Sequence, residues 1–322
     1  ICKNIKSYSK LISGKVFLIS GANGFLGKYF IKTIISMNSQ LNKKAKIIAI
    51  DIKFDNCEIF KNKNVKKIKA DINKINNLKF KSDYVLHAAG IPSPKHYYNK
   101  PIEAIFTSIT GTKKLLDYSK KNKSKFIFFS SSEIYGNPDK KNIPTKETYN
   151  GNVSSIEDRS CYDEGKRVGE TLCYVHYNKY RSNIKVIRPF NVFGPGMSKK
   201  DTRVIPSIVK SLRNNKNIII FNNGKQTRTF CYVTDAINGF LKTLINGKKG
   251  QIYNIGNEKN EISMNNLAKK IKSNFRNNSK IINSSYPSYY PGNEPLRRCP
   301  DISKARRELG QNVLAFLQRH TF

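Results

Sequence analysis

The chain has 322 residues and a formal net charge of +37, from 59 Lys and Arg residues against 22 Asp and Glu residues. Its length suits one large domain or two closely joined domains, and its apolar runs are too short to predict a membrane-spanning helix. The lysines are scattered and accompany no basic arm, so we expect no nucleic acid and no membrane as partners, although the positive field should attract anionic substrates.

Short apolar runs and helical patterns alternate along the first half of the chain. Residues 1–14 come first, are mixed and basic, and lack the apolar stretch of a secretion signal, so a cytoplasmic location is expected. Strands are predicted at 16–20, 47–50, 65–70, 84–87 and 126–129, with helices at about 25–37 and 101–121. This alternation predicts an α/β fold with a doubly wound parallel sheet of the Rossmann type.

The pattern changes at about residue 189, where Asn, Gly and Pro become frequent and the predicted elements shorten to helices at 205–213 and 234–244 and a strand at 218–221. We therefore predict a Rossmann domain at residues 1–188 and a smaller C-terminal lobe at residues 189–322 that covers the substrate. The six cysteines include no C-x-x-C pair, so we predict free thiols in a reducing compartment and no metal site.

A glycine-rich turn joins the first strand to the first long helix. It reads Gly21-Ala22-Asn23-Gly24-Phe25-Leu26-Gly27. Glycines allow a sharp turn and a close approach to a pyrophosphate, and the helix N-terminus supplies N–H groups and the positive end of its dipole. The strand before it and the helix after it make this turn a predicted dinucleotide-binding loop.

The ends of the next strands carry further candidate cofactor contacts. Asp51 ends the second strand, where a carboxylate takes both ribose hydroxyls and repels a 2′-phosphate, which favours NAD over NADP. The alternative for Asp51 is a simple turn residue. Asp71 and Ile72 follow the third strand, where an acid could reach the adenine edge, and Ala88 and Ala89 follow the fourth.

The catalytic candidates are a serine after the fifth strand and the pattern Y-x-x-x-K. Tyr162 and Lys166 lie four residues apart, so on a helix they share one face. A free tyrosine has a pKa of about 10, and a nearby cation together with an oxidised nicotinamide favours its phenolate. Tyr162 is then a candidate base for a sugar hydroxyl, and Ser131 completes a Ser-Tyr-Lys set.

These motifs together resemble the extended short-chain dehydrogenases/reductases, the NAD-dependent epimerase/dehydratase family, from about residue 15 to residue 310. Segments 93–97, 151–153, 159–167 and 298–302 are most similar to the UDP-glucuronate decarboxylases, which make UDP-xylose. The resemblance implies that residues 1–188 bind NAD and carry the catalytic helix, and that residues 189–322 mainly bind a nucleotide sugar, with a UDP-sugar expected.

Two residues after Ser131 separate the activities within this family. The dehydratases usually have Asp-Glu there, with the Asp as the acid and the Glu as the base for loss of water. Here Ser132 replaces that Asp, and Glu133 keeps the carboxylate that typical 4-epimerases lack. Ser-Glu is the pattern of the decarboxylases. The alternative for Glu133 is a solvated acid at a strand end.

The resemblance also implies a set of substrate contacts. Asn191 and Arg228 match family residues that hold the substrate diphosphate, and arginine suits this because its planar fork donates two hydrogen bonds to phosphate oxygens. The alternative for any single arginine is a solvated surface charge. The further substrate-binding candidates are Tyr97, Ser132, Arg159 and Arg203. Arg298 is placed with Glu133 near the reacting carbon as a catalytic residue.

The function expected from the sequence is thus decarboxylation of UDP-glucuronate through a 4-keto intermediate. The alternatives are a 4,6-dehydratase or 4-epimerase of surface-polysaccharide synthesis and, in a different class, a non-catalytic binder of sugar nucleotides or RNA. A homodimer is also expected, because the helices at 101–121 and around Tyr162 are similar to a pair that forms a four-helix interface in the family. The candidate contacts are Ile105, Leu116 and Leu172.

Overall fold

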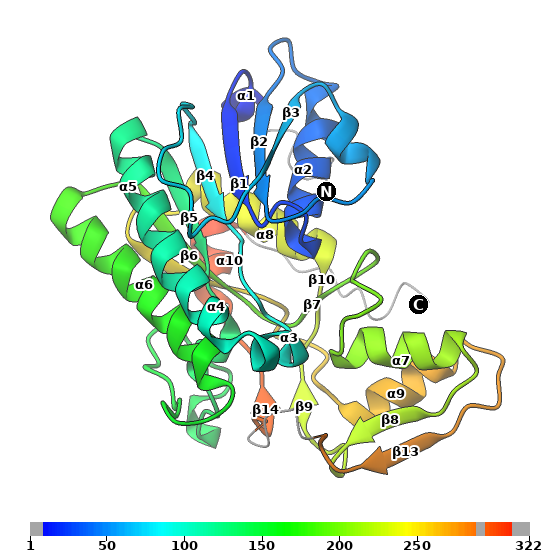
Figure 1. Ribbon diagram of the computed structural model, residues 1–322. Coiled ribbons are helices and arrows are strands. Elements are labelled where there is room, and N and C mark those ends of the chain that lie inside the picture. The colour runs from blue at the N-terminus through cyan, green and yellow to red at the C-terminus, as the bar shows by residue number, and fades with distance from the viewer. Residues whose placement is uncertain (1–8, 288–293, 311–322) are drawn as a thin grey trace.

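A computed structural model describes residues 9–287 and 294–310, and its largest element is a seven-stranded parallel sheet of order β11-β6-β5-β4-β1-β2-β3 (Figure 1). Its strands are β1 Val16–Ser20, β2 Lys46–Asp51, β3 Val65–Lys69, β4 Tyr84–His87, β5 Lys125–Phe129, β6 Ile184–Pro189 and β11 Gln251–Ile255. The strand order reverses between β1 and β4, which opens a crevice at their carboxyl ends. The predicted Rossmann fold and its five predicted strands are confirmed.

Helices cover both faces of this sheet (Figure 1). One face carries α2 Phe25–Asn38, α8 Val233–Asn246 and α10 Ser303–Leu309, and the other carries α5 Thr112–Asn122 and α6 Ser160–Tyr180. The side chains of β5 alternate between the two faces of the sheet. Ile127 and Phe129 point into the core beneath α2, α8 and α10, called here the first core, while Phe126 and Phe128 point into the core beneath α5 and α6, called here the second core. Side chains are apolar on both faces, as a parallel sheet buried on both sides requires.

The helix predicted at 101–121 is broken. It consists of α4 Pro101–Phe106, a five-residue π-turn at Thr107–Gly111, and α5. Helix α6 crosses this region so closely that an added Cβ on Gly165 would lie 3.3 Å from the Cα of Ile105. The wider turn accommodates that crossing, and no pattern in the sequence marks its position.

The smaller lobe lies beside the carboxyl ends of the large sheet (Figure 1). Helices α7 Val204–Arg213 and α9 Met264–Lys272 pack on the parallel pair β8 Ile218–Phe221 and β13 Ile281–Ser284 around one apolar core. A three-stranded sheet of β9 Thr227–Arg228, β12 Ile262–Ser263 and β14 Arg297–Arg298 lies next to it. The remaining elements are α1 Ser9–Ile12, α3 Pro94–Asn99, β7 Val192–Phe193, β10 Cys231–Tyr232 and the 3-10 helices η2 Glu58–Lys61, η4 Ser132–Tyr135 and η5 Lys140–Asn142.

The chain returns to the large sheet after residue 189. Strand β11 pairs with β6, and α8 and α10 pack on the same face as α2. The large layer therefore draws on residues from both sides of the predicted boundary at 188. Within residues 9–287 and 294–310, no helix combines the length and the apolar character that a membrane crossing needs.

One predicted dimer contact is wrong. Leu116 is 2% exposed inside the second core, so it has no surface to offer a partner. Its strict helical spacing with other apolar residues reflects packing against the chain's own sheet. The outer surfaces of α4 and α6 instead expose Ile102, Phe106, Val168 and Val175.

Candidate active site

A cavity of about 880 Å³, called here the large cavity, lies where the carboxyl ends of the sheet face the smaller lobe. The chain segments after β1, β4, β5 and β6 line one side, and α7 and β8 line the other. Seventeen of the candidate residues line it, and eleven of them are Gly21, Gly24, Ser131, Glu133, Tyr97, Arg159, Tyr162, Lys166, Asn191, Arg228 and Arg298. Phe25, Leu26, Gly27, Ala88, Ser132 and Arg203 line it as well.

The glycine loop is pressed against the neighbouring strand end. Gly21 has a φ of +71°, and an added Cβ would lie 2.6 Å from the backbone nitrogen of Ala89. An added Cβ on Gly27 would lie 2.3 Å from the carbonyl oxygen of Gly21. The 14-residue helix α2 starts directly after Gly24, with its N-terminus on the large cavity. This bare backbone cradle at a helix N-terminus fits a dinucleotide pyrophosphate.

Asp51 is fastened to the same loop. Its Oδ2 accepts a hydrogen bond from the backbone N–H of Asn23 at 2.9 Å, and burial raises the pKa of Asp51 above its usual value. The Oδ1 of Asp71 accepts a hydrogen bond from the backbone N–H of Asn73 at 2.9 Å. Ile72 is buried in the second core. Neither Asp51 nor Asp71 lines the large cavity, so their ribose and adenine roles stay predictions.

Helix α6 brings Tyr162 and Lys166 together as the spacing predicts. The Lys166 Nζ lies 5.8 Å from the centre of the Tyr162 ring and donates a hydrogen bond to the carbonyl oxygen of Phe129 at 2.8 Å. The Ser131 hydroxyl caps η4 by accepting the N–H of Glu133 at 3.2 Å, and it also shares a hydrogen bond with Tyr162. One helix and one strand end thus assemble the Ser-Tyr-Lys set.

The electrostatics of this set differ from the expectation in one respect. Burial raises the pKa of Tyr162 above its usual value, and the negative charges of Glu133 and Asp163 raise it further. Burial also lowers the pKa of Lys166 to about 8, opposed by the charge of Glu170. Burial therefore favours the neutral phenol of Tyr162, and the lowering of its pKa that was expected from Lys166 is not what the structure shows.

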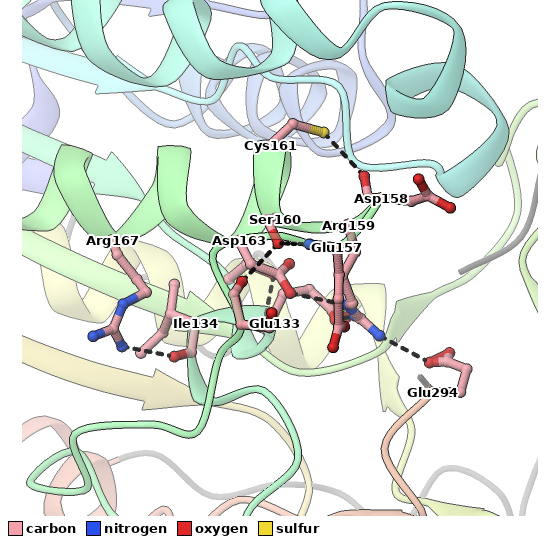
Figure 2. A network of polar contacts seen from close by, with 12 residues as sticks. Glu133, Ile134, Glu157, Asp158, Arg159, Ser160, Cys161, Asp163, Arg167 and Glu294 are labelled. Carbon is pink, nitrogen blue, oxygen red and sulfur yellow. Dashed lines mark hydrogen bonds and ion pairs between the residues drawn. The ribbon is translucent and has the colours of Figure 1, made fainter. Parts of the chain in front are cut away.

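A cluster of arginines and carboxylates surrounds Glu133, and Arg159, Asp163 and Glu294 belong to it (Figure 2). The Arg298 guanidinium forks onto the Glu133 carboxylate, with an Nη2–Oε2 distance of 2.8 Å and a second contact from Nη1 to Oε1. Arg159 reaches between three carboxylates: it contacts Glu133, donates from Nε to Oδ2 of Asp163 at 2.9 Å, and lies 3.5 Å from Glu294. Glu133 is thus held between two guanidinium groups.

The predicted substrate-binding residues surround the rest of the large cavity. Tyr97 stacks on the Tyr162 ring at 5.7 Å between centres. Asn191 donates from its amide to the Thr229 carbonyl at 2.8 Å. Arg228 is buried, with Nη1 donating to the Thr227 carbonyl at 2.8 Å. Arg203 starts α7 and forms an ion pair with Asp201 at 2.6 Å.

Several residues of the site were missed from the sequence. Asp163 stands inside the Y-x-x-x-K pattern, which is a signal that could have been used. Glu294 lies 3.5 Å from both Arg159 and Arg228, and no motif marks it. The negative charge of Glu170 raises the pKa of Lys166 and so partly offsets the effect of burial. Arg188 donates two hydrogen bonds to the Glu170 carboxylate, from Nε to Oε1 at 2.9 Å and from Nη2 to Oε2 at 2.6 Å. Glu170 lies one turn after Lys166, so helical spacing could have found it.

Comparisons with known proteins agree with this geometry. The profile of the NAD dependent epimerase/dehydratase family matches residues 17–256. UDP-glucuronic acid decarboxylase 1 of Arabidopsis thaliana is 32% identical over 300 residues, covering 91% of this chain and 65% of that protein. UDP-glucuronic acid decarboxylase 3 of the same plant is 33% identical over 305 residues, covering 91% of this chain and 83% of that protein.

A solved structure adds a second kind of relative. The UDP-glucuronic acid 4-epimerase of Bacillus cereus, in complex with UDP-glucuronic acid and NAD, superposes with a TM-score of 0.76 at 26% identity, covering 94% of this chain and 95% of that one. All three relatives are enzymes, so the non-catalytic binder considered from the sequence is not supported. The chain spans about 65% of the length of the first Arabidopsis relative.

Proposed function

The chain belongs to the NAD-dependent epimerase/dehydratase family, a family of enzymes with NAD as cofactor, and from this premise we propose that it decarboxylates UDP-glucuronate to UDP-xylose. The observation that carries the proposal is Glu133 clamped by Arg298 and Arg159 next to Tyr162. The two guanidinium groups beside Glu133 can also attract the carboxylate of the substrate and stabilise the charge that develops when this carboxylate leaves as carbon dioxide. Ser132 stands where a dehydratase would need an acid, which disfavours loss of water.

The proposed reaction begins at the sugar C4 hydroxyl. Tyr162 removes the hydroxyl proton, and a bound NAD would supply the redox chemistry that takes up the C4 hydride and gives it back. The resulting 4-keto group is β to the C5 carboxylate. Carbon dioxide can therefore leave with the bonding electrons delocalised into the ketone as an enolate. A proton then adds to C5, and Tyr162 gives its proton back to the C4 oxygen as the hydride returns.

Arg298 and Glu133 act at C5 in this proposal. The Arg298 guanidinium is 6% exposed on its side chain, so its charge is little screened by water. Arg298 binds the substrate carboxylate and stabilises the negative charge that develops as carbon dioxide leaves. Glu133 holds Arg298 in place through the two-pronged contact and directs protons near C5.

The rest of the large cavity accounts for the nucleotide. Arg228 and Asn191 hold the diphosphate, and Arg203 leaves its ion pair with Asp201 to join them. Guanidinium forks match phosphate oxygens and stay charged at any working pH. The glycine loop would hold the pyrophosphate of NAD, and Lys166 and Tyr162 would act beside its nicotinamide.

A second candidate is 4-epimerisation of UDP-glucuronate. It is favoured by the B. cereus structure, whose protein is named for that activity and is 26% identical. Both candidates share the 4-keto step and the acidic sugar, and they differ in whether the carboxylate leaves. An epimerase has to keep the carboxylate, whereas the Glu133–Arg298 pair in this chain supports its loss.

A single incubation separates these candidates. The protein is mixed with NAD and, in separate tubes, UDP-glucuronate, UDP-glucose and dTDP-glucose, and the products are weighed by mass spectrometry. A product lighter than UDP-glucuronate by one carbon dioxide supports the proposal. An unchanged mass with a new retention time supports epimerisation. A product lighter by one water from either neutral sugar contradicts both and supports dehydration.

A homodimer remains part of the proposal. The exposed apolar residues Ile102 and Phe106 belong to α4, and Val168 and Val175 belong to α6, two helices that pack against each other. Pairing this surface with its copy would form a four-helix contact that buries these side chains. The cytoplasmic location and the polysaccharide pathway expected from the sequence stay predictions.

A further inference from the structure

Asp163 is a buried carboxylate that the proposed reaction does not use. It follows Tyr162 on α6, and its side chain is 2% exposed. Its Oδ2 accepts a hydrogen bond from the Arg159 Nε at 2.9 Å, while its Oδ1 has no hydrogen-bond partner among the residues that the structure describes. A buried carboxylate oxygen with no partner is costly, so this acid has a reason to gain a proton.

The charges around Asp163 are balanced in the absence of substrate. Arg159 contacts the carboxylates of Glu133, Asp163 and Glu294 (Figure 2). Arg298 forks onto Glu133, and Arg228 lies 3.5 Å from Glu294. Three carboxylates thus face three guanidinium groups. The charged and titratable groups that act on Asp163 or feel its charge are Glu133, Arg159 and Arg298, with Tyr97, Cys161 and Tyr162.

Asp163 lines a second cavity of about 570 Å³, called here the small cavity. Arg159 and Glu294 line both cavities, whereas Glu133 lines the large cavity and Asp163 lines the small one. The Arg159 guanidinium therefore stands in the wall between them. The small cavity is therefore the side from which we expect a proton to reach Asp163.

We propose that Asp163 takes up a proton when an anionic sugar nucleotide binds, and so keeps this buried cluster electrically balanced. The inference rests on the proposed function. UDP-glucuronate brings a diphosphate and a carboxylate. Arg228 and Arg298 would then share their charge with those anions, which leaves Arg159 as the main counter-charge for the three carboxylates of the cluster. Protonation of Asp163 removes one of those negative charges.

The acid is poised for this role. Burial and the Glu133 charge raise the pKa of Asp163 to about 7, against the opposing effect of Arg159. More negative charge in the large cavity would raise that pKa further. Conversion of UDP-glucuronate to UDP-xylose and carbon dioxide also consumes one proton for each turnover, so a group that loads a proton from solvent on binding suits the chemistry.

Protonation of Asp163 would also help Tyr162. The ionised Asp163 is one of the charges that raise the pKa of Tyr162. A neutral Asp163 removes that effect, so binding of the substrate would move Tyr162 toward the phenolate that removes the C4 proton. Asp163 is therefore a positioning residue for charge, which acts on the reacting atoms only through Arg159 and Tyr162.

Calorimetry tests the proton uptake directly. The NAD-loaded Tyr162→Phe protein, which should not turn over, is titrated with UDP-glucuronate at pH 7.5 in buffers of different ionisation enthalpy. A group with a pKa of about 7 is roughly one quarter protonated at that pH, so binding should take up roughly three quarters of a proton. Affinity should fall as the pH rises above about 7, because uptake becomes harder.

Two further variants in the Tyr162→Phe background complete the test. Asp163→Asn keeps the size of the side chain and should remove most of the proton uptake and most of the pH dependence of affinity, leaving only what Lys166, with its pKa of about 8, can take up. His96→Gln is the matched control, because His96 lines the large cavity but is not among the groups that act on Asp163. It should leave the uptake unchanged. Loss of uptake with His96→Gln, or its persistence with Asp163→Asn, would overturn the inference.

Other outcomes are also decisive. Absence of proton uptake by the Tyr162→Phe protein overturns the inference even where Asp163→Asn does not fold. If UDP-glucuronate does not bind, the proposed substrate is rejected, and the same titrations with UDP-glucose decide the role of Asp163 through its diphosphate alone. If neither sugar nucleotide binds, both proposals are wrong.

Discussion

Replacement of Arg298 by lysine tests the proposed chemistry at one position. Arg298 donates two hydrogen bonds to the Glu133 carboxylate, one of them at 2.8 Å, and its side chain is 6% exposed. Lysine keeps the positive charge but has one nitrogen, so Arg298→Lys removes one charge-assisted hydrogen bond at a site that water hardly reaches. Removing such a hydrogen bond costs about 1.5–3 kcal/mol, which is roughly 10- to 150-fold.

The assay compares chemistry with binding. We expect kcat/KM for UDP-glucuronate to fall about 10- to 150-fold in Arg298→Lys. The affinity for UDP-xylose, which has the same nucleotide and no carboxylate, should change by less than about threefold, since the guanidinium fork of Arg298 serves the carboxylate. Thermal unfolding of the variant, followed by circular dichroism, shows whether the fold is retained.

The neighbouring residue provides the matched control. Arg297 also forks onto a carboxylate, that of Glu261 at 2.8 and 2.9 Å, but its side chain is 42% exposed and it does not line the large cavity. Exposed ion pairs contribute about 0–1 kcal/mol, so Arg297→Lys should keep nearly full activity. The reasoning is refuted if Arg298→Lys keeps more than about a third of kcat/KM, or if Arg297→Lys is equally harmful.

Three further predictions concern the base, the cofactor and the oligomer. Tyr162→Phe should reduce turnover by about 10²-fold or more while NAD still binds, because a positioned acid–base group is removed, and retention of a tenth of the rate would contradict its role. Asp51→Ala should narrow the preference for NAD over NADP in calorimetry, and equal affinity of the unaltered protein for both cofactors would remove the ribose role of Asp51. Phe106→Asp should turn a dimer into a monomer by light scattering at micromolar concentration, since Phe106 is 51% exposed on α4, and an unaltered protein that is already monomeric would contradict the proposed interface.

Much of the candidate site was accessible from local patterns. The glycine loop, Ser131, Tyr162 and Lys166 each lie within a short segment whose geometry follows from a strand end or from one helix turn. The Ser-Glu pattern after Ser131 led to Glu133, and the segment at 298–302 that resembles the decarboxylases led to Arg298. Their contact across 165 positions of sequence could not be predicted from spacing, because it depends on how β14 pairs with β9 and where that sheet lies.

The pKa shifts of the site residues and the burial of individual side chains could not be predicted from the sequence. Desolvation raises the pKa of Tyr162 and lowers that of Lys166, and the sequence contains no measure of how much water a side chain loses. Leu116 is an example of the same limit, since an apolar residue at helical spacing can face its own core or a partner. The break between α4 and α5 depends on how closely α6 crosses, which is again a tertiary property.

Hydrophobic periodicity and short-range spacing were enough to predict the parallel Rossmann sheet, the dinucleotide loop and the Ser-Tyr-Lys set, because both act within a few turns of chain. The position of Arg159 between Glu133, Asp163 and Glu294, in the wall of two cavities, follows only from the folded chain. Side chains from these separate segments meet only after the sheet and the lobe have packed. The cost of burying their charges then depends on that packing.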